Sequence, residues 1–124
     1  MRPLLLNEGV ITLPQMIIDR LFSMILTTDK SRSTLSVEDP ESLAYVLKSN
    51  TDNMSATATE FEKILQRKYL KYADSVESEV RAVAISDTGY YNLIVKVTIY
   101  SDGRSYDLQE CIRVEDAVTF KILK

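Results

Sequence analysis

The sequence predicts an α+β fold, with N-terminal helices packed on an antiparallel β-meander in two layers. Three observations predict it. Apolar residues recur at helical spacing up to about residue 72, and apolar and polar residues alternate further along the chain. Asp102-Gly103 separates two alternating runs, as a two-residue hairpin turn does. The 124 residues, of which 45% are hydrophobic, suffice for a single domain with one core, with residues 1–13 and 116–124 as possible extended arms.

Three helix starts can be recognised in the first half of the chain. Thr12 to Gln15 matches a capping box with proline in the first turn, and it opens a helical pattern that runs to about Leu26. Asp39-Pro40-Glu41 combines a capping residue, a proline that presets φ and an acidic residue for the positive end of the dipole. Thr57 to Glu60 is a further capping box, before a helix that runs to about residue 72. The residues expected on the apolar helix faces are Ile17, Ile18, Leu21, Phe22, Met24 and Ile25, then Leu43, Val46 and Leu47, then Phe61, Ile64, Leu65, Tyr69 and Tyr72.

The hairpin around Asp102-Gly103 has a register that can be checked against its chemistry. A type I′ turn at these two residues makes the numbers of opposed residues sum to 205, so that Val97 meets Leu108. One face is then apolar apart from Glu110, and the other face is largely polar. Because a slip of one residue would destroy this agreement, the pattern predicts this register.

The strands beside this hairpin are less fully specified. The preceding strand runs from about Val76 to Ile85, and its connection is either a three-residue loop, Asp87-Thr88-Gly89, or a four-residue loop that includes Ser86. The tail, Val118 to Leu123, either adds a short strand or packs as an arm.

The composition excludes most catalytic and metal chemistry. The chain has no His, so that a Ser-His-Asp triad, a Cys-His dyad and a His-ligated metal are impossible within it. Cys111 is its single cysteine, so that an internal disulfide and a Cys-rich zinc site are excluded. A net charge of −3 argues against nucleic acid as a partner, and no apolar run is long enough for a signal peptide core or a membrane helix. We therefore expect no cofactor, no metal and a protein made in a reducing cytoplasm or in a particle assembled there.

The carboxylates Glu77 and Glu79 are the one candidate for catalysis. On one face of a strand they would lie about 7 Å apart, a separation that overlaps the one used in glycoside hydrolysis. That chemistry also needs sugar platforms and one carboxyl group in an apolar pocket, whereas this chain has no Trp and the neighbouring residues are Val, Ser, Val and Arg. A solvated strand face is the favoured interpretation.

Other polar groups have structural interpretations beside functional ones. Arg32 is flanked by hydroxyl residues, and such an arginine can tie a loop to the carboxylates of a partner. Glu110 is either a strand end near solvent or a residue that finds its partner on another protein. Cys111 is expected to be a small packed residue. The basic residues towards residue 71 complement a helix dipole and are expected on a solvated face: Lys63, Arg67, Lys68 and Lys71.

Several short motifs occur in the order typical of one family. Met24-Ile25-Leu26-Thr27-Thr28 is followed by a turn and by Ser31-Arg32, and a helix from Leu43 ends in a polar stretch at Asn53. A longer helix runs to Tyr72, and the meander contains Leu93-Ile94-Val95-Lys96-Val97. Over residues 14 to 115 this order resembles the gene-25-like, or W-type, baseplate wedge family of contractile phage tails, which includes a type VI secretion baseplate component.

The resemblance implies partner contacts, and the chain departs from the family's motifs at two positions, one in a turn and one at a contact. The family has Gly before Ser-Arg where this chain has Lys30, and it has Glu-Pro-Arg where this chain has Ala73-Asp74-Ser75. In the family that second motif docks the protein onto the helical core of its wedge partners. The implied contact residues are therefore Tyr72, Ala73, Asp74 and Ser75, in addition to Arg32 and Glu110.

The function that the resemblance implies is structural and not enzymatic. The chain would be a virion protein of the tail baseplate, assembled in the host cytoplasm, with wedge proteins and tail sheath subunits as partners. It would join the wedge core and seed the sheath by exchanging strands at a sheet edge. The alternative is a small peptidoglycan hydrolase that uses a carboxylate pair, because the family has been given a lysozyme label.

Overall fold

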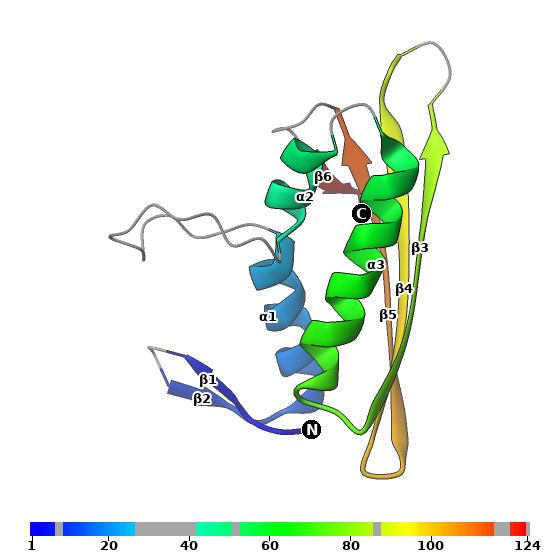
Figure 1. The fold of residues 1–124 in the computed structure, drawn as a ribbon. Coiled ribbons are helices and arrows are strands. Elements are labelled where there is room, and N and C mark those ends of the chain that lie inside the picture. The colour runs from blue at the N-terminus through cyan, green and yellow to red at the C-terminus, as the bar shows by residue number, and fades with distance from the viewer. Residues whose placement is uncertain (7–8, 27–41, 51–52, 86–87, 116–119, 124) are drawn as a thin grey trace.

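In the computed structural model, which describes all residues except 7–8, 27–41, 51–52, 86–87, 116–119 and 124, helices pack on one face of an antiparallel sheet (Figure 1). The elements are, in chain order, β1 (Leu4–Leu6), β2 (Gly9–Ile11), α1 (Pro14–Leu26), α2 (Leu43–Ser49), α3 (Met54–Leu70), β3 (Ser75–Ala84), β4 (Tyr91–Ser101), β5 (Arg104–Val114) and β6 (Phe120–Leu123). The main sheet has the order β3-β4-β5-β6, and β1 and β2 form a separate two-stranded hairpin. The predicted α+β class is confirmed.

The β4–β5 hairpin has the predicted register. Its pairs run from Tyr91 opposite Val114 to Ser101 opposite Arg104, so that all opposed numbers sum to 205. Asp102 and Gly103 have φ angles of 56° and 77°, the left-handed conformation that a type I′ turn needs at both positions. The turn and the alternation therefore agree, and the face that contains Leu93 lies against the helices.

The strands on either side of this hairpin show how β3 connects to β4 and what the C-terminal tail forms. β3 pairs with β4 from Ser75 opposite Tyr100 to Ala84 opposite Tyr91, and Ile85 N–H donates to the Tyr90 carbonyl oxygen at 2.9 Å. The connection is therefore the four residues 86–89, the longer of the two predicted loops. β6 pairs with Cys111–Val114 of β5, so that the C-terminal tail adds a strand.

The core lies between the sheet and the helices. α3 lies along the sheet, and α1 and α2 lie beside it (Figure 1). Among the described residues the fully buried side chains come from both layers and include Ile17, Ile18, Leu43, Val46, Phe61, Leu65, Tyr69, Leu93, Val95, Ile99 and Ile112. Tyr72, expected on the apolar face of the third helix, follows the end of α3 and is half-buried.

Met24 does not lie on the buried face of α1, as predicted, but is 43% exposed. The buried arc of this helix is centred near Ile18 and Ile25, and at 100° per residue Met24 lies outside it. The predicted capping-box bond between Thr12 and Gln15 is not formed, and the Gln15 side-chain amide instead donates to an Asp19 carboxylate oxygen at 3.2 Å.

The other two helices begin at different residues from those predicted. α2 begins after Ser42, whose Oγ accepts the Tyr45 N–H, and the predicted start at 39–41 lies outside the described residues. α3 begins after Asn53, whose side-chain oxygen accepts the Ala56 N–H at 3.1 Å. The predicted capping box at Thr57 is wrong, because Asn53 already caps the helix one turn earlier and the Thr57 side chain is buried inside it.

Candidate assembly surfaces

The connection between α3 and β3, together with the first residue of β3, contains four of the six predicted contact residues. Tyr72 is half-buried and Ala73 is buried, whereas Asp74 and Ser75 are exposed. The Tyr72 carbonyl oxygen accepts the Arg2 N–H at 2.9 Å, and the Lys71 carbonyl oxygen accepts from the Arg2 guanidinium at 2.8 Å. A cation at the last carbonyls of a helix also complements its dipole, so that the N-terminal segment stabilises this connection.

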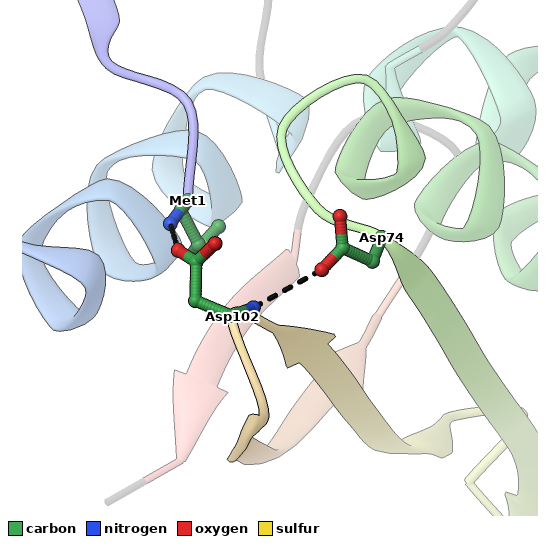
Figure 2. Close-up of polar contacts among 3 residues, drawn as sticks. All are labelled: Met1, Asp74 and Asp102. Carbon is green, nitrogen blue, oxygen red and sulfur yellow. Dashed lines mark hydrogen bonds and ion pairs between the residues drawn. The ribbon is translucent and has the colours of Figure 1, made fainter.

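Asp74 holds the tip of the β4–β5 hairpin (Figure 2). Its Oδ2 accepts the Asp102 N–H at 3.0 Å, and its own N–H donates to the Tyr100 carbonyl oxygen at 2.9 Å. The Asp102 carboxylate in turn forms an ion pair with the α-amino group of Met1 at 3.1 Å. Asp74 therefore has an internal role in addition to its exposure, because it satisfies the N–H of a non-glycine residue with positive φ.

Glu110 lies on the helix-facing side of β5, opposite Val95, and is half-buried. Within the described residues its side chain has no hydrogen bond or ion pair. It lies close enough to Tyr69 to affect that phenol, whose hydroxyl donates to the Ile18 carbonyl oxygen at 2.8 Å. Burial, with smaller contributions from the charges of Asp19 and Glu110, raises the pKa of Tyr69. Glu110 is thus set inside the sheet and not at a strand end.

Two other predicted sites have different outcomes. Arg32 lies outside the described residues. Glu77 and Glu79 both project from the open face of β3 and are exposed, and Glu79 forms an exposed ion pair with Arg81 at 3.7 Å. The described residues contain no group of three or more potential metal ligands of the His, Cys, Asp and Glu types.

The edge of the sheet at β5 is only half covered. A two-residue hairpin makes Ser101 and Arg104 a hydrogen-bonded pair, so that even-numbered residues of β5 bond to β4 and odd-numbered ones direct their N–H and C=O groups away from it. β6 covers this edge only from Cys111 to Val114. In the described part of the chain no strand lies beside Ser105, Asp107 and Gln109, all of which are exposed.

An open hollow of about 320 Å³ marks the end of the covered edge. Gln109, Cys111 and Leu123 line it together with Ile94 and Lys96. Leu123 is the last described residue of β6, so that the hollow continues the line of that strand towards the uncovered part of β5. Cys111 is half-buried in this hollow as a free thiol.

Several apolar side chains of the N-terminal part are exposed, which the sequence analysis did not predict. Leu5 and Val10 face each other across the β1–β2 hairpin and are both exposed, as are Leu13, Met16 and Met24 at or on α1. Figure 1 shows this hairpin projecting away from the sheet. The signal in the sequence is the pair of short apolar runs on either side of Gly9, which is typical of a hairpin.

Comparisons with protein-family models, with curated proteins and with solved structures found no significant match to this chain. Within the described residues, no helix combines the length and the hydropathy that crossing a bilayer requires.

Proposed function

We propose that this chain is a structural component of a contractile phage tail baseplate that joins wedge proteins and seeds the sheath by strand exchange. The observation that carries the proposal is the uncovered edge of β5 at Ser105, Asp107 and Gln109. The motif order that resembles the baseplate wedge family supplies the identity of the partners. The proposed role contains no catalytic step, cofactor or metal, and it locates the protein in the virion.

The proposed mechanism is the addition of a partner strand to β5 in line with β6. Each outward-facing residue offers one N–H and one C=O group, and an extended backbone can pair with a row of such groups. Ser105, Asp107 and Gln109 provide three such residues over a length typical of a short strand. The hollow beside Leu123 leaves room for a side chain of the incoming strand where β6 ends.

The proposed contact with the wedge core uses the connection between α3 and β3. Asp74 and Ser75 are exposed and therefore accessible to a partner, whereas Ala73 is buried and can contribute only through its backbone. The exposed apolar side chains of β1, β2 and α1 are of the kind that assembly proteins bury against partners.

The hydrolase alternative gains no support from the geometry. A glycosidase needs one carboxyl group in an apolar environment that keeps it protonated. Glu77 and Glu79 are instead exposed on the open face of the sheet, and Glu79 is paired with Arg81.

Replacing Gln109 by proline tests the proposal. The N–H of Gln109 points away from β4, so Gln109→Pro removes a group offered to a partner while the β4–β5 ladder stays intact. The variant is expected to stay folded but to lose co-purification with sheath protein encoded beside its own gene, whereas Gln109→Ala retains it. The readouts are thermal unfolding for the fold and co-expression followed by affinity purification for assembly.

Three results would contradict the proposal, the first two of them from the native chain and its gene. The first is that the native chain joins neither wedge nor sheath proteins on co-expression, and the second is that no such genes flank its own. The third is that Gln109→Pro assembles as well as Gln109→Ala, which would exclude the β5 edge as the place of strand addition.

A further inference from the structure

The edge of the sheet at β3 differs from the edge at β5. Since odd-numbered residues of β3 bond to β4, the even-numbered residues direct their main-chain groups outwards. Two of these groups have partners, but the partners are side chains of α3. The Val76 carbonyl oxygen accepts from the Gln66 side-chain amide at 2.6 Å, and the Val80 N–H donates to Glu62 Oε1 at 2.9 Å.

Ser78 lies between Val76 and Val80 on β3, and its side chain also contacts α3. Its hydroxyl lies 3.0 Å from the Glu62 carbonyl oxygen and 3.1 Å from Gln66 Oε1, both of which can accept its proton. Glu62 and Gln66 are four residues apart and so lie on the same face of α3, one helical turn apart. We refer to Glu62, Gln66 and Ser78 as the edge clasp.

The edge clasp takes the place of a neighbouring strand. It supplies an acceptor to the Val80 N–H and a donor to the Val76 carbonyl oxygen, which are two of the outward-facing groups that an added strand would bond. An incoming strand would have to displace both side chains from partly buried hydrogen bonds. Beyond the edge clasp, only Ala82 and Ala84 of β3 direct main-chain groups outwards, which is a short length for holding a strand.

We infer that the edge clasp closes β3 to strand addition and thereby makes β5 the edge that accepts a partner strand. The second half of this inference rests on the proposed function, whereas the closing of β3 does not. Natural proteins commonly protect sheet edges in this way, because an open edge templates pairing with another chain.

The partner that an opened β3 edge fits is the β3 edge of a second copy. If two β3 strands pair antiparallel about Val80, the outward-facing residues of each meet those of the other. Glu79 of each copy then lies opposite Arg81 of the other, so the charges are complementary. In this register Ser78 meets Ala82, and no like charges face each other.

The test compares Glu62→Ala/Gln66→Ala with Lys63→Ala, a matched control on the same helix. The double variant is expected to dimerise in light scattering at concentrations where the native chain and the control are monomeric. At dilutions that keep it monomeric, its Val80 amide is expected to exchange about tenfold faster, since losing one such hydrogen bond changes the opening equilibrium by about that factor. Reversing the charge at Arg81 with Arg81→Glu should abolish the dimer.

A double variant that stays monomeric, with Val80 exchange equal to that of Lys63→Ala, would overturn the inference. If the double variant does not fold, Gln66→Glu replaces the donor to Val76 by a carboxylate of the same shape, and the dimerisation measurement applies to it. The outcome is separable from the proposed function, since native protein that never binds sheath subunits refutes that function while the dimerisation of the variant still tests the edge clasp.

Discussion

At the scale of single residues, Tyr69 shows how one polar atom is accommodated in the core. Its side chain is the largest of the fully buried ones among the described residues, and its hydroxyl joins α3 to α1 through the Ile18 carbonyl oxygen. Burial first, and then Asp19 and Glu110, raise its pKa above the ordinary value near 10. Above that pH the folded state therefore retains a proton that the unfolded chain releases, and the free energy of unfolding falls as the pH rises.

We predict that Tyr69→Phe flattens this dependence on pH. A tyrosine whose pKa is raised by folding lowers the free energy of unfolding by up to about 1.4 kcal/mol for each pH unit above its unfolded pKa. Well below that pKa it has no such effect. At neutral pH the variant loses about 1 kcal/mol with the hydrogen bond to Ile18. Urea unfolding at pH 7 and between pH 10 and 11 measures both effects, with the more exposed Tyr100→Phe as the control.

A slope above pH 10 that is equal in Tyr69→Phe and in the native chain would contradict this account. A part of the slope is expected to remain, because burial also raises the pKa of Tyr91, although its hydrogen bond with Thr57 partly offsets that rise.

At the scale of elements, the start of α3 yields a prediction that distinguishes two caps. Asn53→Ala removes the acceptor for the Ala56 N–H and should lower the free energy of unfolding by about 1 kcal/mol. Thr59→Ala, at an exposed position inside the helix, should have no such effect or should stabilise slightly, because Ala has the higher helix propensity. Chemical denaturation measures both. A larger loss for Thr59→Ala than for Asn53→Ala would contradict Asn53 as the cap.

The same elements show which features a sequence can predict. The β4–β5 register was predictable because the turn at Asp102-Gly103 and the alternation beside it are local and agree with each other. The start of α3 was not, since Asn53 and Thr57 are both good capping residues and their order along the chain does not decide between them. The edge clasp was also missed, because Glu62 and Gln66 look like ordinary helix surface until β3 is seen beside them.

At the scale of the whole molecule, the N-terminal segment belongs to the fold and not only to a surface. Met1 pairs with the Asp102 carboxylate, Arg2 bonds to the end of α3, and Leu4 is buried at 2% exposure. The next residue, Leu5, is 76% exposed on the projecting hairpin. The N-terminal segment, expected as a possible extended arm, thus forms its own hairpin. It also links the turn of the β4–β5 hairpin to the end of α3.

This arrangement predicts opposite outcomes for two adjacent leucines. Leu4→Ala should lower the free energy of unfolding by about 2 to 4 kcal/mol, because it leaves a cavity beside the core. Leu5→Ala should change it by less than about 0.5 kcal/mol, because its side chain is already in water. Urea unfolding of the two variants measures the difference, and the pair is matched in residue type, strand and size of the deletion. Equal losses would mean that the segment does not anchor the fold, whereas a stable Leu5→Ala that binds wedge proteins less well would assign the exposed leucine to assembly.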